Sequence, residues 1–335
     1  MKSLEERAGK TEYTGKTEYN RRLQAGERRK TDLTRKGRAF GIAYGILLTA
    51  FTLYVVLDTF VITRVYQEAV VSSVTVERSG GTVNTGTLAG AVLISDRMYQ
   101  DENISVVLTE YEAYDTTIYV ADVVVTSDEY LKTAMAKNAY GKNVTAKTSE
   151  TAELFDAILA INGDYYGARE KGYVIRNGVL YRSTAVKNQE DLVIYADGSF
   201  AIINESEVSA EQLLADGAMQ VLSFGPALVI DGAISVTTEE EVGRAKASNP
   251  RTAIGMIEDG HYVFVVSDGR TDESEGLSLY QLAEFMSSLG VTTAYNLDGG
   301  GSSTMYFNGT VINNPTTTGN SVKERKVSDI VYIGY

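Results

Sequence analysis

The sequence predicts an α+β fold: a mixed, largely antiparallel β-sheet body rich in hairpins, a few packed helices and one N-terminal transmembrane helix. Three observations lead to this prediction. Five Asn-Gly or Asp-Gly pairs lie between runs of apolar or β-branched residues. Helix-capping patterns are few, and the sequence has neither a repeated strand–helix–strand period nor a GxGxxG motif. An uncharged apolar stretch near the N-terminus is long enough to cross a bilayer.

The apolar stretch predicts a membrane anchor at residues 39–63. Its first part reads AFGIAYGILLTAFTLYVVL, which contains no charged residue, and the apolar run resumes after Asp58. A cleaved signal peptide is disfavoured because the leader is long and no A-x-A cleavage site follows. Basic residues crowd just upstream, so the positive-inside rule predicts a single-pass protein of the cell membrane, with a cytoplasmic N-terminus and an extracellular body.

Charge and composition divide the rest of the chain. Residues 1–38 have a net charge of +6 and the remainder has −19. We therefore expect residues 1–38 to form a basic, disordered cytoplasmic tail. Residues 64–102 are expected to form a stalk or linker, and residues 103–335 the folded body. The acidic body argues against nucleic acid as a partner.

Hairpins and caps define the elements of the body. The five expected hairpin turns are Asn177-Gly178, Asp197-Gly198, Asp231-Gly232, Asp259-Gly260 and Asn308-Gly309. Ser278 and Gln281 form a capping box that opens a helix, which Gly290 ends. A second capping pattern at Ser209 predicts a helix that closes at Gly217. A third helix is expected from Asp128 to Tyr140.

Residue usage restricts the available chemistry. The chain has no Cys and a single His, His261. Disulfides, thiolate chemistry, Cys-ligated zinc and multi-His metal sites are therefore excluded. A Ser-His-Asp triad would require His261, which lies beside an Asp-Gly turn typical of a surface hairpin. Acid–base work is expected to fall to carboxylates.

Four segments place short polar residues where an apolar strand begins or ends. They contain Asn162 with Asp164, Arg251 with Thr252, Asp268-Gly269-Arg270, and Asp298-Gly299-Gly300-Gly301-Ser302-Ser303. Each taken alone can be an ordinary Asx turn or a surface residue. The last segment is unusual because three consecutive glycines are entropically costly between strands. Such a loop can direct N–H groups and hydroxyls at an anion.

Taken in order, these motifs resemble the phosphodiester glycosidase family over residues 150–335. The matching segments are Asn162–Tyr166, Gly225–Leu228, Arg251–Gly255, Asp268–Arg270 and Asn296–Thr304. The family includes the animal uncovering enzyme and bacterial surface proteins related to exopolysaccharide. Two features depart from its pattern: Asp164 stands where a second glycine is common, and the disulfides of animal members cannot form.

The resemblance implies a hydrolase that cleaves a sugar–O–phosphate linkage at the anomeric carbon, in a carbohydrate phosphodiester or cell-surface polysaccharide. A phosphomonoester leaves readily, so a carboxylate and cationic phosphate ligands suffice. We expect catalytic roles for Asp298, Asp268 and Arg251. The residues expected to bind substrate are Asn162, Asp164, Thr252, Gly269, Arg270, Gly299, Gly300, Gly301, Ser302 and Ser303.

Two alternatives stay open from the sequence. The same loop could bind a wall glycan or teichoic-acid-like polymer without turnover. Alternatively, an Asp-rich, His-poor site suits a phosphodiesterase that uses Ca²⁺ or Mg²⁺ to cleave the P–O bond. No cofactor is established by the sequence, and a divalent cation is the one that its acidic residues would accommodate.

Overall fold

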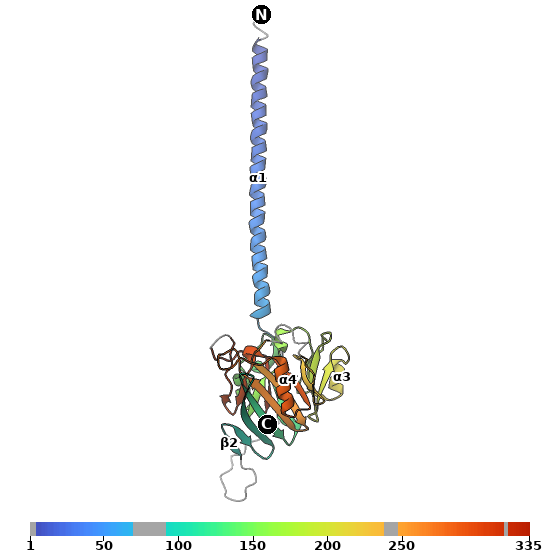
Figure 1. Ribbon diagram of the computed structural model, residues 1–335. Helices are drawn as coiled ribbons and strands as arrows, with labels where there is room; N and C mark the ends of the chain where they lie inside the picture. Colours follow the sequence, from blue (N-terminus) through green and yellow to red (C-terminus); the bar gives the residue numbers. More distant parts are fainter. Residues whose placement is uncertain (1–4, 70–91, 238–246, 318–320) are drawn as a thin grey trace, which may run out of the picture. The chain divides into compact units, whose positions relative to one another are not determined.

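The computed structural model describes residues 5–69, 92–237, 247–317 and 321–335, and for residues 5–19 and 31–33 it describes the backbone alone. The chain divides into two compact units, Met1–Ile62 and Thr63–Tyr335. The second unit is a body of antiparallel sheets with a few short helices, so the predicted α+β class is confirmed (Figure 1).

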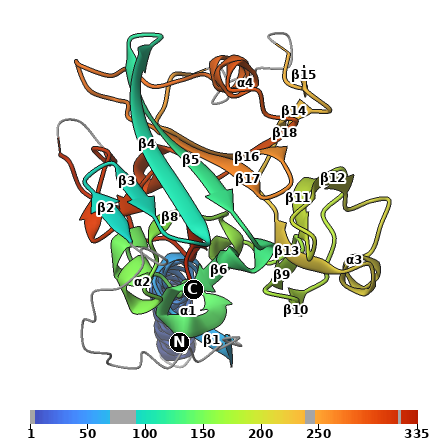
Figure 2. The same cartoon turned by 90° about the horizontal axis from the view of Figure 1, so that it is seen from below.

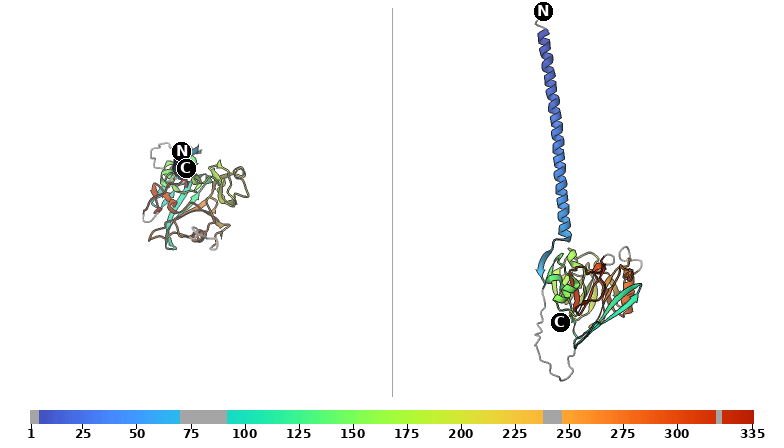
Figure 3. Two further views of the ribbon diagram at one scale, coloured as in Figure 1. Left: turned by 90° about the horizontal axis from the view of Figure 1, so that it is seen from above. Right: turned by 90° about the vertical axis from the view of Figure 1, so that its left-hand side faces the viewer.

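The first unit is one helix, α1 (Glu5–Phe60), which runs without a break (Figure 3). The tail expected to be disordered is therefore helical from Glu5 onward in this structure. The segment contains no proline and many Glu, Lys, Arg, Leu and Ala residues, which favour helix. Within the described residues, Asn20–Phe60 is long and apolar enough to cross a membrane, as judged by length and composition alone.

The body contains four sheets, and every strand pairing among its described residues is antiparallel. In spatial order, the nine-stranded sheet consists of β15 (Ala233–Ile234), β14 (Ala227–Ile230), β18 (Thr293–Asn296), β16 (Arg251–Glu258), β17 (His261–Ser267), β5 (Thr116–Val125), β4 (Ile104–Ala113), β3 (Met98–Gln100) and β2 (Leu93–Ser95). One five-stranded sheet consists of β20 (Thr310–Val311), β19 (Met305–Phe307), β8 (Leu159–Asn162), β21 (Asp329–Ile333) and β6 (Leu131–Met135). The other consists of β10 (Val179–Arg182), β9 (Val174–Arg176), β13 (Ala218–Leu222), β11 (Glu190–Tyr195) and β12 (Phe200–Asn204). A two-stranded sheet pairs β1 (Arg64–Glu68) with β7 (Ala139–Lys142).

All five predicted hairpins are confirmed. The turns connect β9 to β10, β11 to β12, β14 to β15, β16 to β17, and β19 to β20. At the first of them, Asn177 and Gly178 have φ values of 50° and 73°. Positive φ at both central residues matches the right-handed twist of the flanking strands, which is why Asn-Gly is favoured there.

The short helices are α2 (Thr148–Leu154), α3 (Ala210–Ala215) and α4 (Leu279–Ser288), with the 3₁₀ turns η1 (Asp128–Tyr130), η2 (Ala136–Asn138), η3 (Tyr166–Ala168) and η4 (Gly300–Ser302). The predicted starts of α3 and α4 are confirmed. The Ser209 hydroxyl accepts from the N–H of Gln212 at the start of α3. At α4 the capping box forms in both directions, between the Ser278 hydroxyl and the Gln281 N–H and between the Gln281 side chain and the Ser278 N–H.

Two expectations about the start of the body are wrong. The segment from Asp128 to Tyr140 is not a helix but holds η1, β6, η2 and the start of β7. Pairing of β6 with β21 supplies its hydrogen bonds, and φ values of 56° and 52° at Lys137 and Asn138 cannot continue a helix. The expected linker at 64–102 contains β1, β2 and β3, so the body begins at Thr63. Its central part, 70–91, lies outside the described residues.

The largest core lies between the nine-stranded sheet and the two five-stranded sheets. Fully buried side chains from all three meet there, among them Phe264, Ile161 and Leu192. Helix α4 covers the opposite face of the nine-stranded sheet with Leu282 and Met286 (Figure 2). This packing brings β8, β16 and β18 together and positions the strand ends that form the candidate site.

Candidate active site

The four polar segments of the sequence meet at one place in the fold. Strand β8 ends at Asn162, β16 begins at Arg251, and β17 ends at Ser267. Arg251 pairs with Ser267 across the antiparallel strands, and Ala253 pairs with Asn296 at the end of β18. Since the end of one antiparallel strand lies beside the start of its neighbour, residues far apart in sequence converge at this edge.

Asn162 is the centre of this convergence. Its side chain is wholly buried and donates to the carbonyl of Asp298 at 2.6 Å. Its amide oxygen accepts from the Thr252 hydroxyl at 2.8 Å and from the N–H of Thr304 at 3.2 Å. These contacts are all with the protein, so they favour a role in holding the Asp298 loop over direct binding of sugar hydroxyls.

The three glycines allow the Asp298 loop to approach other backbone closely. The N–H of Gly300, which has a φ of 66°, donates to the Pro250 carbonyl at 2.7 Å. A Cβ on Gly299 would lie 2.9 Å from that same carbonyl oxygen. The N–H groups of Ser302 and Ser303 donate to carbonyls within the loop. Three N–H groups thus bond to the protein itself, which leaves fewer for an anion than the sequence suggested.

Two arginines flank the glycines. A Cβ on Gly300 would lie 2.9 Å from Nη2 of Arg270, and one on Gly301 would lie 2.8 Å from Nη2 of Arg325. Both arginines are exposed, and within the described part of the chain neither lies within 4.0 Å of a carboxylate oxygen. Burial, followed by the nearby charge of Arg325, lowers the pKa of Arg270. Two cationic groups therefore lie beside this loop, and neither forms a salt bridge with a described acidic side chain.

Arg270 is held in place by uncharged acceptors. Its Nη1 donates to the Thr317 carbonyl at 2.7 Å and its Nη2 donates to Oδ1 of Asn249 at 2.9 Å. These bonds orient the guanidinium without cancelling its charge, so the group can still bind an anion.

Asp298 is half-buried at the start of this loop. Burial raises the pKa of its carboxyl, while the Ser302 hydroxyl and the charge of Arg325 act in the opposite direction. The carboxyl thus lies near the positive charge of Arg325. Such a group can act as a general base or as a nucleophile.

The second predicted carboxylate, Asp268, has its oxygens occupied. They accept from the backbone N–H of Asn314 at 2.8 Å, from its side-chain amide at 3.0 Å and from Asn313 at 3.2 Å. Asn313 also donates to the Ser303 carbonyl at 3.0 Å. Asp268 is buried, so these contacts favour a role in holding residues 313–314 against the Asp298 loop. A Cβ on the following residue, Gly269, would lie 2.7 Å from the Pro250 nitrogen, so glycine is needed there for close packing.

Arg251, like Asp268, is buried and bonded to neighbouring groups of the protein. Its Nε donates to the Leu277 carbonyl at 2.8 Å and its Nη2 to the Ala247 carbonyl at 3.1 Å. The side chain is buried, and its backbone N–H donates to the Ser267 hydroxyl. These bonds favour a positioning role for Arg251 over direct phosphate binding.

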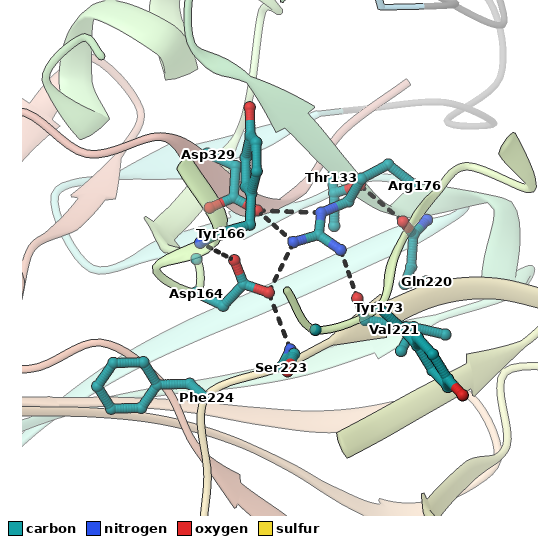
Figure 4. Close-up of polar contacts among 12 residues, drawn as sticks. Thr133, Asp164, Tyr166, Tyr173, Arg176, Gln220, Val221, Ser223, Phe224 and Asp329 are labelled. Atoms are coloured by element: carbon teal, nitrogen blue, oxygen red, sulfur yellow. Dashed lines mark hydrogen bonds and ion pairs between the residues drawn. The ribbon is translucent and has the colours of Figure 1, made fainter. Parts of the chain in front are cut away.

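Asp164 lies behind the loop, in a buried ion cluster that it forms with Arg176 and Asp329 (Figure 4). Nη2 of Arg176 lies 2.8 Å from Oδ2 of both aspartates. The remaining oxygen of Asp164 accepts from the N–H of Tyr166 at 2.9 Å, and Oδ2 also accepts from the N–H of Ser223. The Asp164 carboxylate, which was expected to bind substrate, is therefore directed into the interior.

In this buried ion cluster, the single guanidinium of Arg176 pairs with two carboxylates, Asp164 and Asp329. Burial first, and then the negative charge of Asp164, raise the pKa of Asp329, while Arg176 opposes them. Asp329 therefore retains a proton more readily than an ordinary aspartate. This leaves the cluster closer to neutral than its formal charges indicate.

Sequence reasoning missed Arg176, Asn313, Asn314, Arg325 and Asp329. A run of charged residues, Lys323-Glu324-Arg325-Lys326, was visible but resembles a solvated surface segment. Nothing in the local sequence indicates that Arg176 reaches Asp329, 153 residues away. Among the described residues, no group of three or more His, Cys, Asp or Glu side chains could hold a metal ion, so a divalent cation remains a hypothesis.

Comparison with known proteins agrees with the motifs. A family model described as phosphodiester glycosidase matches residues 155–334. An uncharacterised SPbeta prophage-derived protein, YomE, of Bacillus subtilis is 33% identical over 186 residues, which are 53% of this chain and 28% of YomE. The human N-acetylglucosamine-1-phosphodiester alpha-N-acetylglucosaminidase is 30% identical over 188 residues, 51% of this chain and 36% of the human protein. The chain thus spans about a third of the length of these relatives.

A solved structure supports the fold. The zebrafish N-acetylglucosamine-1-phosphodiester alpha-N-acetylglucosaminidase catalytic domain, auto-inhibited by its pro-peptide, superposes with a TM-score of 0.56 at 21% identity, covering 69% of this chain and 83% of that domain. More than half of the chain lies within the matched family model. The chain belongs to the phosphodiester glycosidase family.

Proposed function

We propose that this chain is a membrane-anchored, extracytoplasmic hydrolase that cleaves a sugar–O–phosphate diester in a surface glycan, releasing free sugar and a phosphomonoester. One observation carries the proposal: the half-buried Asp298 carboxyl begins a glycine loop beside which lie two exposed guanidinium groups, those of Arg270 and Arg325, neither in a salt bridge with a described carboxylate. The names of the human, mouse and bovine relatives, which describe glycosidases of N-acetylglucosamine-1-phosphodiesters, support the same reaction class.

The proposed roles follow from charge. A phosphodiester is an anion, and planar guanidinium groups bind phosphate oxygens with two parallel hydrogen bonds. Arg270 and Arg325 would hold the phosphate against Gly300 and Gly301, where the absence of Cβ atoms permits close approach. Their charge also offsets the repulsion between the phosphate and Asp298.

Asp298 would face the anomeric carbon, either attacking it or activating a water molecule. Because a phosphomonoester is a good leaving group, the reaction needs little protonation of the departing oxygen. This fits a site in which Asp298 is the single carboxylate available to act on the substrate. Asn162, Thr252, Arg251 and Asp268 would act as positioning residues through their bonds to the loop and its neighbours. Ser302 and Ser303 would bind the substrate through their hydroxyl groups.

The location is also proposed. Helix α1 contains the apolar segment that could span a bilayer, and the basic residues before it favour a cytoplasmic N-terminus. The acidic body would then lie outside the membrane, where surface glycans are found.

The deciding experiment locates the broken bond. The full chain in lipid nanodiscs is incubated with the methyl diester of N-acetylglucosamine 1-phosphate in ¹⁸O-labelled water. Glycosidase action releases free sugar and leaves the phosphomonoester unlabelled, since C–O cleavage adds the water oxygen to the sugar. The phosphate is the better readout because the anomeric oxygen of a free sugar exchanges with water.

Two outcomes would contradict the proposal. Label in the phosphate, with loss of activity on exhaustive chelation, would assign the chain to metal-dependent phosphodiesterases. Binding of the diester without any product would assign it to glycan-binding proteins.

A further inference from the structure

A second cavity, away from the Asp298 loop, has a volume of about 490 Å³. It lies where β6, at the edge of one five-stranded sheet, faces β9, β10 and β13 of the other. This volume falls within the range of small-molecule sites, about 300–1,000 Å³. The cavity shares one residue with the buried ion cluster, Arg176.

Aromatic side chains form part of the wall of this cavity. The tyrosines that line it are Tyr130, Tyr181, Tyr195, Tyr332 and Tyr335. Tyr130 and Tyr335 meet edge to face, with ring centroids 5.2 Å apart. Tyrosine rings offer apolar faces together with polar hydroxyls, so they suit ligands that have both characters.

One part of the wall is polar and rigid. The Gln220 side-chain oxygen accepts from the Thr133 hydroxyl at 2.6 Å and from the N–H of Asn177 at 2.9 Å. The Asn177 amide in turn donates to the Thr133 carbonyl at 2.9 Å. These bonds tie the edge of β6 to the neighbouring sheet and hold the cavity in a defined shape.

Several polar atoms of the lining have no protein partner. Among the described residues, the hydroxyls of Tyr130, Tyr195 and Tyr332 form no hydrogen bond, and the buried Oδ1 of Asn138 has no donor. An acyl chain or other purely apolar occupant would leave these groups unsatisfied at a cost in free energy. A ligand with its own hydroxyls or amides would satisfy them.

The lining has no excess of positive charge. Its described charged side chains are two acids, Asp128 and Glu129, and two bases, Lys132 and Arg176. The guanidinium of Arg176 is also already paired with two buried aspartates. The cavity therefore lacks the uncancelled positive charge of the Asp298 loop and favours a neutral ligand over an anion.

We propose that this cavity binds a neutral carbohydrate unit, a mono- or disaccharide, independently of the phosphodiester site. A sugar ring presents C–H faces that pack on tyrosine rings and hydroxyls that both donate and accept hydrogen bonds. The cavity matches these features in its tyrosine rings, its unpartnered polar atoms and its lack of excess positive charge. The site would hold a neutral stretch of glycan on the enzyme without taking part in hydrolysis.

The test uses the full chain in lipid nanodiscs and two neutral disaccharides without phosphate, N,N′-diacetylchitobiose and maltose. Calorimetry should detect saturable binding of at least one of them. Met219→Trp fills the cavity from its partly exposed rim and should weaken binding roughly tenfold or more. Tyr195→Ala, which removes an aromatic wall, should weaken it in the same direction.

Two controls locate the binding. Val107→Trp places the same large side chain on the exposed face of β4 and should leave affinity unchanged. Asp298→Asn should also leave it unchanged, even though it disables the proposed hydrolysis. Absence of binding by both disaccharides at about 20 mM would overturn the proposal. So would unchanged affinity in folded Met219→Trp and Tyr195→Ala, or loss of binding in Asp298→Asn.

Discussion

The Asp298 loop and the buried ion cluster combine the same residue types in opposite ways. In the buried ion cluster, Arg176 is 2% exposed, and its guanidinium donates to Asp164, Asp329 and the carbonyls of Ile175 and Val221. At the loop, Arg270 and Arg325 are exposed and have no acidic partner among the described side chains. The first arrangement pairs its guanidinium with carboxylates of the protein, and the second leaves its guanidinium groups available to a ligand.

Topology accounts for the difference. The buried ion cluster lies between β8, β9 and β21, where surrounding sheets exclude water, so every charge there needs a partner. The loop lies where strands end, so the chain can leave charges exposed to solvent without a large desolvation cost. An arginine beside an aspartate therefore indicates a functional site only when its charge remains available.

The largest effect is expected from Asp298→Asn, which should lower the turnover of a sugar-1-phosphodiester by about 10³-fold or more. The substitution removes the carboxylate but keeps its size, so the melting temperature should change little. Asp231→Asn, in the exposed β14–β15 turn, is the matched control and should keep full activity. Retained turnover in Asp298→Asn would remove the loop from catalysis.

Breaking the buried ion cluster should affect stability. Arg176→Met leaves two buried carboxyls without their cation and should lower the free energy of unfolding by about 3–5 kcal/mol. The control is Arg97→Met, which breaks the exposed pair with Glu110 and should cost about 1 kcal/mol or less. Denaturant titration measures both. Equal losses in the two variants would mean that burial does not distinguish these ion pairs.

Removing one arginine beside the Asp298 loop should weaken substrate binding without unfolding the protein. For Arg325→Met, loss of a charge-assisted hydrogen bond of about 1.5–3 kcal/mol corresponds to a rise in KM of about 10- to 150-fold. The effect should shrink at high salt, which screens exposed charges. Lys323→Met removes a charge from the same segment and should leave KM near that of the unmodified chain. An equal rise in both variants would reduce the role of Arg325 to general surface charge.

The smallest effect concerns Asp191, which adjoins the buried ion cluster. Burial, followed by the charge of Glu205, raises the pKa of Asp191 to about 9. The unfolded chain releases this proton near its ordinary pKa of about 3.8, whereas the folded chain keeps it. The folded state therefore binds more protons between these values, and the stability contribution of Asp191 falls as pH rises from about 4 to about 9.

Asp191→Asn should remove that dependence. The melting temperature should rise by about 2 °C or more at pH 8 relative to the unmodified chain, and by less at pH 5. Asp259→Asn, in an exposed hairpin turn, should show no such pH-dependent difference. A parallel shift of Asp191→Asn at both pH values would indicate altered packing rather than a buried proton.

Local patterns predicted much of the body. The Asn-Gly and Asp-Gly turns place all five hairpins, because the positive φ that the glycine of each pair adopts is a local requirement. The caps at Ser209 and Ser278 begin α3 and α4 through an equally local contact, because each hydroxyl accepts from the N–H three residues later. The helix expected at Asp128–Tyr140 failed because β21, almost 200 residues further along the chain, supplies the pairing that makes part of it a strand.

By itself, the sequence determined the hairpins, two helix starts, the restriction of acid–base chemistry to carboxylates and the family motifs at strand ends. Only the tertiary structure decided which charges are cancelled. It places Arg176 between Asp164 and Asp329, and brings Arg325 to Gly301. The physical reason is distance: capping and turn formation depend on a few neighbouring residues, whereas the neutralisation of a charge depends on partners that only packing of the sheets brings within about 3 Å.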